Sequence, residues 1–305
     1  MRAEHLHVVT AISNPLRWES RIRLYRDFER HMLESGVRLT TVECAYGDRP
    51  FVLADNPKIS HVAVRARSMV WTKENLLNVG ISRLPLDWKY VAWIDADVSF
   101  RRSDWAAETV QALQQYDVVQ PWTDCYDLGP CGEHLMAHRS FCKQWLNHEP
   151  IGPGPYRFAH PGYAWAATRE ALNHLGGLIE TAALGAADHH MALALAGMVE
   201  LSLPDALEPG YSRPIVEWQR RADTHIAGNL GCVPGTIEHH WHGAKALRRY
   251  IDRWQVLIRH RFDPAADLKR NVWGVLELTG NKPELRRDID AYLRGRNEDS
   301  NSLEA

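Results

Sequence analysis

Two carboxylates separated by one residue, Asp95 and Asp97, directly follow the apolar segment 90–94 (YVAWI). In an open α/β sheet, ligands bind beyond the carboxyl ends of the strands, which is where this pair is expected. Side chains two residues apart in an extended chain point the same way, so the two carboxylates repel each other. A divalent cation such as Mg²⁺ or Mn²⁺ relieves this repulsion and keeps open positions for phosphate oxygens. The alternative interpretation is a pair of surface aspartates in a turn.

The segments that must position this pair alternate between strand and helix patterns. Strands are predicted over 5–12, 37–44, 58–65, 89–95 and 116–122, and helices over 17–36, 72–84 and 103–115. Because segment 89–95 is almost wholly apolar, it is expected to be a central parallel strand covered on both faces. The alternation predicts a doubly wound α/β fold with helices on both faces of the sheet.

The second half of the chain has a less regular pattern. Residues 123–157 are rich in Gly, Pro, Cys and His and are predicted to form a long functional loop. Helices are predicted over 168–177 and 186–197, and segment 236–262 reads as a strand end, a turn and a basic helix. The polar segment 296–305 is expected to be a flexible tail, which leaves 1–295 as a single domain.

Composition narrows the class of protein. The chain has 305 residues, of which 45% are apolar, enough for a sizeable core. A net charge of −2 gives no general attraction to nucleic acid or anionic membrane. No segment approaches the ~20 consecutive apolar residues of a membrane span. Five cysteines, few and odd in number, suit reduced thiols, so a cytoplasmic protein is expected.

Six stretches, in this order, carry a resemblance to a known family. They are AISNPLR (11–17), KENLLNVG (73–80), WIDAD (93–97), the segment 160–178 that begins HPGYAW, LGAADHH (184–190) and EHHWHG (238–243). Together they resemble the GT-A glycosyltransferases of the β-1,4-galactosyltransferase type over about residues 6–243. The chain departs from the family in its acidic cluster, of which Asp188 alone remains. The Golgi anchor and stem of the eukaryotic members are not seen in this sequence, so a soluble relative from a bacterium or phage is expected.

The resemblance implies a GT-A (Rossmann-like) mixed sheet, mostly parallel, with helices on both faces. Residues 1–122 would form a nucleotide-binding half, and 123–295 the half that completes the acceptor and metal sites. It further implies metal-dependent, inverting transfer of a sugar from a nucleoside diphosphate sugar, UDP-linked, to a hydroxyl acceptor, with Mn²⁺ or Mg²⁺ as the metal. The acceptor remains open: a glycan, a protein and a modified DNA base are alternatives. The oligomeric state is open as well.

Several side chains take donor-binding roles under this resemblance. Asp97 resembles the metal-binding aspartate, and Asp95 the one that reaches the ribose. The positions expected to contact the donor are Thr10, Pro15, Arg17, Lys73, Asn78 and Gly162, with Lys245 and Arg248 on the diphosphate. For Lys245 and Arg248, the alternative interpretation is an ordinary solvent-exposed basic face of a helix.

The downstream histidines are candidates to complete the metal site. His240 and His242 lie two apart near a strand end, so both could face the cation, and imidazole nitrogen suits Mn²⁺ better than Mg²⁺. His242 is favoured because Gly243 lets the backbone approach a ligand closely, and His240 is the alternative. A structural role is the other interpretation for each.

Asp188 is the candidate general base, because the family uses an aspartate of the acidic cluster to accept the acceptor's proton. The alternative is an N-cap for the helix that follows. Two other functions remain in view. The literal Asp188–His189–His190 run is shared with DHH-type metal-dependent phosphoesterases, and the reduced acidic cluster would suit a non-catalytic sugar-binding protein on a degenerate glycosyltransferase fold.

Overall fold

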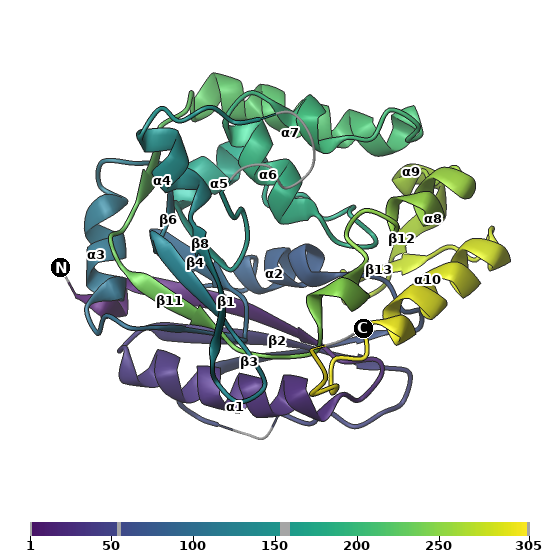
Figure 1. The fold of residues 1–305 in the computed structure, drawn as a ribbon, viewed down its shortest axis with the longest axis horizontal. Coiled ribbons are helices and arrows are strands. Elements are labelled where there is room, and N and C mark those ends of the chain that lie inside the picture. Colours follow the sequence, from purple (N-terminus) through teal and green to yellow (C-terminus); the bar gives the residue numbers. More distant parts are fainter. Residues whose placement is uncertain (1, 54–55, 153–158, 304–305) are drawn as a thin grey trace.

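The computed structural model describes residues 2–53, 56–152 and 159–303. Its centre is a seven-stranded sheet in the order β10-β6-β9-β4-β1-β2-β3 (Figure 1). The strands are β1 (Leu6–Ser13), β2 (Arg38–Tyr46), β3 (Ser60–Ala66), β4 (Tyr90–Ile94), β6 (Val118–Gln120), β9 (Ala164–Thr168) and β10 (Leu230–Cys232). All neighbours are parallel except at β9, which runs antiparallel to both β4 and β6. The predicted mixed, mostly parallel sheet is therefore confirmed.

Strand β4 shows why the sheet is covered on both faces. Val91 and Ala92 are both fully buried, and they belong to two different apolar layers. Successive side chains of a strand point to opposite faces, so an uninterrupted apolar run needs an apolar layer on each side. This agrees with the prediction that segment 89–95 is a central strand covered on both faces, although β4 is parallel only to β1 and antiparallel to β9.

Helices supply the two layers. On one face, α1 (Glu19–Glu34) and α3 (Trp105–Ala112) contribute Phe28 and Trp105 to the core. The other face is covered by α2 (Lys73–Ile81), α5 (Arg169–Leu175), α6 (Ala187–Leu195) and α7 (Pro209–His225). In Figure 1, α1 lies below the sheet and α5, α6 and α7 lie above it.

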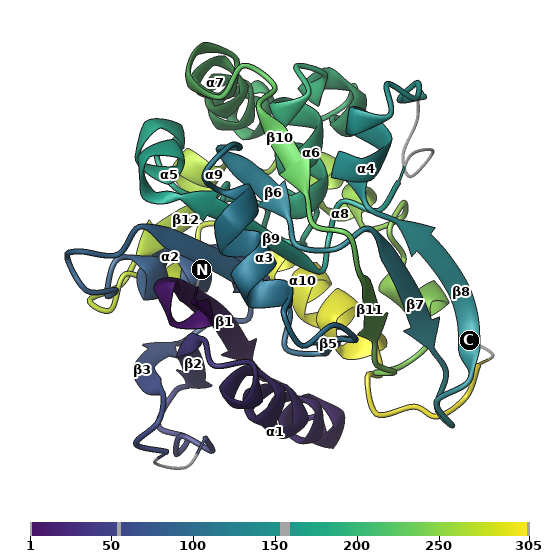
Figure 2. The same ribbon diagram turned by 90° about the vertical axis from the view of Figure 1, so that its left-hand side faces the viewer.

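A smaller sheet lies beside the large one and has the order β5-β11-β7-β8 (Figure 2). Its strands are β5 (Val98–Phe100), β11 (Thr236–His239), β7 (Asp124–Leu128) and β8 (His134–Arg139). β11 pairs antiparallel with β5 and parallel with β7. The short helix α4 (Phe141–Leu146) follows β8.

The prediction of a long loop over 123–157 is therefore wrong for residues 124–146. The strand pattern was hidden because Asp127, a charged residue, takes an inward position of β7, and because β8 is exposed along nearly its whole length. Residues 153–157 of the predicted loop lie outside the described part of the chain.

The C-terminal region is broken into short elements. After β11 come a 3-10 turn (Lys245–Arg248) and then α8 (Trp254–Arg259), instead of one continuous basic helix. The break falls at Arg249, whose φ of 42° is left-handed. The remaining elements are α9 (Pro264–Asp267), the hairpin of β12 (Leu268–Arg270) and β13 (Leu276–Leu278), and α10 (Pro283–Gly295).

The start of the segment after α10 is packed, in contrast to the flexible tail predicted over 296–305; residues 301–303 are exposed, and 304–305 lie outside the described part of the chain. Arg296 and Glu298 are 4% and 1% exposed. The Asp299 carboxylate accepts hydrogen bonds from the backbone N–H groups of Glu19 (2.9 Å) and Ser20 (2.8 Å) at the start of α1. Composition alone does not reveal this, because the burial of these polar residues depends on partners nearly 280 positions away. No helix in the described ranges is long and apolar enough to cross a membrane.

Candidate active site

A cavity of about 740 Å³ opens at the carboxyl edge of the large sheet. Most of the predicted site residues line it: Thr10, Pro15, Lys73, Asp95, Asp97, Gly162, Asp188, His242, Lys245 and Arg248. Because β9 runs against its neighbours, the residues before its start meet the residues after the end of β4 at this edge. The Asp95 N–H accordingly donates to the Tyr163 carbonyl (2.8 Å). Thr10 joins the two central strands there through a bond from its hydroxyl to the Ile94 carbonyl (2.8 Å).

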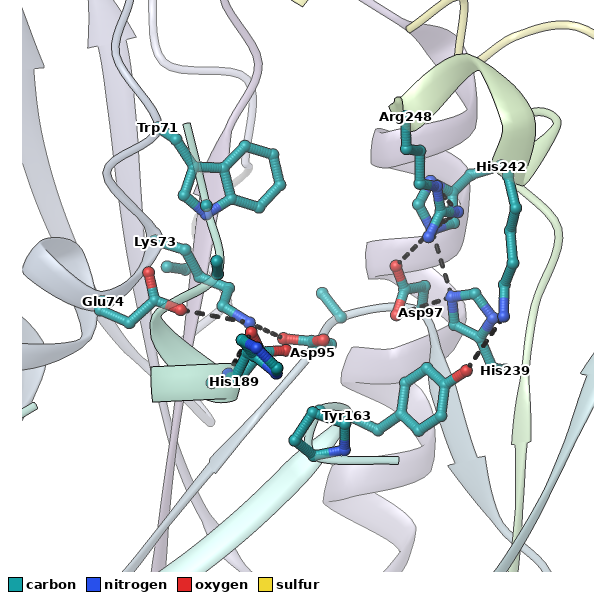
Figure 3. Close-up of a pocket in the computed structure, with 18 of the residues that line it drawn as sticks. Trp71, Lys73, Glu74, Asp95, Asp97, Tyr163, His189, His239, His242 and Arg248 are labelled. Carbon is teal, nitrogen blue, oxygen red and sulfur yellow. Dashed lines mark hydrogen bonds and ion pairs between the residues drawn. The ribbon is translucent and has the colours of Figure 1, made fainter. Parts of the chain in front are cut away.

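Asp97 is brought beside two histidines by strand register. β5 begins at Val98, which is paired with His239 of β11, and the His240 N–H donates to the Asp97 carbonyl (2.8 Å). His242 follows after a turn, and its Nε2 lies 2.9 Å from Asp97 Oδ2 and 3.2 Å from His239 Nε2. His239 Nε2 lies 3.9 Å from Asp97 Oδ1 (Figure 3).

This cluster has the chemistry of a cation site. Burial opposes ionisation of Asp97, but His242 and His239 outweigh it and lower its pKa. Burial lowers the pKa of His239 to about 4 against the opposing effect of Asp127, so at neutral pH its ring is uncharged. An ionised carboxylate and a neutral imidazole are the forms that bind metal. Asp97 Oδ1 is buried and has no hydrogen-bond partner among the described residues. A bound cation would take the place of that missing partner.

Only one of the two predicted histidines lies in the cavity. His242 faces Asp97, but His240 does not line the cavity, and its Nε2 lies 2.9 Å from Ser99 Oγ. The alternative that His240 faces the cation is contradicted, because β11 continues to His239 and its alternation turns His239 inward and His240 outward. Sequence reasoning missed His239, although the buried Ile237 two residues earlier sets the same phase. Gly243 adopts a φ of 85°, and a Cβ there would lie 2.7 Å from the Asn297 carbonyl, so this glycine admits the C-terminal segment.

A wall of arginines closes the cavity behind the histidines. Arg248 is buried, its NH2 lies 2.9 Å from His242 Nε2, and its Nε has no partner in the described part of the chain. The Glu298 carboxylate accepts from Arg21 Nε (2.6 Å) and Arg296 Nε (2.8 Å), and its Oε2 lies 3.6 Å from His242 Nδ1. The packed C-terminal segment is thus part of the site.

The opposite side of the cavity is acidic, with one lysine (Figure 3). Lys73 Nζ lies 3.0 Å from Asp95 Oδ1 and 3.4 Å from Glu74 Oε1. Burial raises the pKa of Asp95 despite the opposing effect of Lys73. Burial also raises the pKa of Glu74 to about 7. Lys73 is therefore the cation around which the carboxylates of this side gather.

Asp188 faces the cavity from the first turn of α6. The N-cap position belongs to Ala186, so Asp188 is not the N-cap of this helix. A Cβ on Gly162 would lie 2.7 Å from Asp188 Oδ2, so the missing side chain makes room for the carboxylate against the β9 approach. Ala186 and Tyr163, which both line the cavity, have left-handed φ values of 85° and 75°. Such backbone costs about 1–3 kcal/mol each and is common at functional sites.

Two other predicted donor contacts lie elsewhere. Arg17 is exposed and does not line the cavity. The Asn78 side chain bonds the backbone N–H and carbonyl of Leu178 (2.9 and 3.0 Å), which fastens α2 to the segment after α5. His190, of the DHH run, has its ring nitrogens 2.7 Å from Ser202 Oγ and 3.0 Å from the Tyr211 hydroxyl, away from the Asp97 cluster. It therefore packs α6 and offers no metal ligand to the cavity.

No protein-family model and no curated protein matches this sequence. In structure the chain is similar to GT-A nucleotide-diphospho-sugar transferases. A mutant β1,4-galactosyltransferase 7 from Drosophila, in complex with manganese, UDP-Gal and xylobiose, matches with 12% identity, coverage of 66% of this chain and 63% of that one, and a TM-score of 0.36. TarS from S. aureus in complex with UDP matches with 12% identity, coverage of 74% and 66%, and a TM-score of 0.39. A candidate nucleotide-diphospho-sugar transferase from Desulfovibrio desulfuricans G20 matches with 13% identity, coverage of 96% and 98%, and a TM-score of 0.33.

The Glu298 ion pairs generate a stability prediction. Glu298→Gln leaves Arg21 and Arg296 without their shared carboxylate, so the free energy of unfolding should fall by about 3 kcal/mol in urea titrations at pH 7. Glu284→Gln is the control, because its partner Arg287 is 69% exposed, and it should cost below about 0.5 kcal/mol.

Wild type and Glu298→Gln should also differ in how their free energy of unfolding depends on pH. Burial opposes ionisation of Glu298, but the two arginines lower its pKa well below the ordinary value of 4.5. A lowered folded-state pKa contributes stability above pH 4.5 that is lost as the pH falls through the folded pKa. The difference between wild type and Glu298→Gln should therefore shrink in acid. A difference that grows in acid would contradict the assignment.

Proposed function

We propose that this chain is a metal-dependent, inverting glycosyltransferase that moves a sugar from a UDP-linked donor to a hydroxyl acceptor. The observation that carries the proposal is the convergence of Asp97, His239 and His242 inside the cavity at the carboxyl edge of the sheet. In doubly wound folds this edge is where nucleotides bind. A carboxylate with two imidazoles suits Mn²⁺, with Mg²⁺ as the alternative.

The residues around this cluster divide the work of holding the donor. Asp97, His239 and His242 would hold the cation, which when bound supplies Lewis-acid neutralisation of the leaving diphosphate. Arg248 and Lys245 add fixed positive charge on the same side. Asp95, held by Lys73, faces the ribose, while Thr10 and Pro15 line the nucleoside end and Gly162 the sugar. The donor would thus lie across both halves of the chain, residues 1–122 and the half that begins at 123 and includes the packed Arg296 and Glu298. We place this single domain in the cytoplasm.

Asp188 serves as the general base on the acceptor side. In a single displacement, the acceptor oxygen forms a bond to the anomeric carbon while the bond from that carbon to the diphosphate oxygen breaks. Asp188 takes the hydroxyl proton, and the nucleoside diphosphate leaves with the bonding electrons. Attack from the face opposite the leaving group inverts the anomeric centre. The acceptor is a hydroxyl compound that enters beside Trp71 and His189, which also line the cavity.

Donor hydrolysis in Mn²⁺ without acceptor tests the metal site. Wild type should bind Mn²⁺ and slowly release free sugar and UDP. Asp97→Asn and His239→Ala should weaken Mn²⁺ binding at least about 10-fold and abolish release, because the first removes the negative charge of a ligand and the second removes a ligand. His240→Ala is the matched control and should behave as wild type. Loss of binding in His240→Ala with retention in His239→Ala would contradict the site.

The products of the same assay separate the rival functions. Release of inorganic phosphate or of sugar phosphate would indicate a phosphoesterase, and donor binding without any product would indicate a sugar-binding protein. Either result would contradict the proposed transferase.

Asp188→Asn tests the base. It should leave the Kd for UDP and Mn²⁺ unchanged and lower the transfer rate about 10²–10⁴-fold, measured with whichever acceptor is active. Asp205→Asn, an exposed aspartate on the loop before α7, is the control. A transfer rate near that of wild type in Asp188→Asn would show that another group accepts the proton.

A further inference from the structure

We propose that Asp127 is a positioning residue that fixes His239 with Nε2 toward Asp97 and, with its second oxygen, holds Lys245 at the cavity wall. This inference rests on the proposed function, because it assigns a role in the cation site and on the diphosphate side. Asp127 belongs to no motif of the sequence and reaches the site through the fold alone.

Strand register places Asp127 next to His239. β7 and β11 run parallel with Asp127 paired to His239, and β11 and β5 run antiparallel with His239 paired to Val98, the residue after Asp97. The register of these three strands therefore places Asp127 beside His239, and Asp97 one residue before the β5 partner of His239. The arrangement follows from backbone hydrogen bonding, so it does not depend on the conformation of one flexible side chain.

Both oxygens of Asp127 are fully used. The residue is 4% exposed. Its Oδ1 accepts from His239 Nδ1 (2.8 Å) and from the Tyr163 hydroxyl (2.8 Å). Its Oδ2 accepts from His138 Nε2 (2.6 Å) and from Lys245 Nζ. A buried carboxylate is expensive unless it is paired and hydrogen-bonded, and four donors around one carboxylate meet that requirement.

The bond to Asp127 sets the chemistry of His239. An ionised carboxylate can only accept, so His239 must donate the proton on Nδ1, and the lone pair of a neutral ring is then on Nε2. That atom is the one facing Asp97 and His242. Carboxylates behind metal-binding histidines commonly fix ring orientation and increase ligand basicity in this way. Without Asp127 the His239 ring could rotate or change tautomer.

Lys245 is the second branch of the network. Its Nζ contacts Asp127 and lies 3.4 Å from both His138 Nε2 and the Tyr163 hydroxyl. The side chain is 35% exposed and lines the cavity, so its charge is held at the wall and remains in reach of an anionic ligand. One buried carboxylate thus orients a cation ligand and a lysine on the diphosphate side.

The test is Mn²⁺ binding to the purified, metal-free chain, followed by electron paramagnetic resonance. Asp127→Asn keeps the size of the side chain but removes its charge and half of its acceptor capacity. Its Kd for Mn²⁺ should rise about 10–100-fold relative to wild type. Asp124→Asn is the matched control, on the same strand but 44% exposed and bonded to Lys143, and its Kd should stay within about 2-fold of wild type.

The outcomes distinguish this inference from the proposed function. If wild type binds Mn²⁺ through Asp97 and Asp127→Asn binds it equally well, the positioning role is overturned and the transferase site stands. If wild type does not bind Mn²⁺, or binds it without Asp97, the proposed function fails first.

A measurement on wild type keeps the inference testable if Asp127→Asn does not fold. Long-range ¹H–¹⁵N spectra of the metal-free protein at pH 7, assigned by the signal lost in His239→Gln, report the tautomer of His239. The proton should be on Nδ1. A proton on Nε2 would overturn the inference without any change at Asp127.

Discussion

Three lone-pair-bearing groups, Asp97, His239 and His242, converge in a buried space where no hydrogen bond from a described residue reaches Asp97 Oδ1. A cation bound among the three side chains would satisfy this buried oxygen and accept a lone pair from each unprotonated ring. Charged side chains surround these three residues. Arg248 approaches His242 from one side, and the carboxylates of Asp127 and Glu298 lie behind the two rings.

The three side chains converge because each of the two sheets contains a strand that runs antiparallel to a neighbour. β9 runs against the large sheet and brings Tyr163 and Gly162 to the carboxyl ends of its neighbours. In the small sheet, β5 runs against β11, so the end of β11 meets the start of β5 at Asp97. The packed segment after α10 then closes the wall through Glu298. Residues separated by almost the whole chain are thereby held within a single cavity, and the left-handed backbone at Tyr163 and Ala186 is the conformational cost of that geometry.

Local sequence patterns were enough to predict most strands and helices of the large sheet. The apolar run of β4, the periodicity of α1 to α3 and the alternation of β2 and β3 identify the large sheet and its helices. Asp97 could be placed at the cavity because it directly follows a strand end, whereas Lys73 and Asp188 were assigned to the site through the family resemblance. These features need no knowledge of which strands are neighbours.

What the sequence did not reveal depends on non-local pairing. His239 was passed over for His240, because pairing with β5 and β7 is what extends β11 to His239, so that the phase set by Ile237 applies to it. Asp127 hid the strand it belongs to, since a charged residue at an inward position breaks the apolar alternation unless its partners are known. The buried Glu298 shows the same effect at the C-terminal end, where polar composition indicated a loose tail.

The most direct test of the shared-cation account is a crystal grown with Mn²⁺ and UDP, measured on both sides of the manganese absorption edge. The account predicts one anomalous peak in contact with Asp97, His239 and His242 and with the UDP phosphates. A peak beside Asp95 or His240, or UDP bound with no peak among these three side chains, would contradict it.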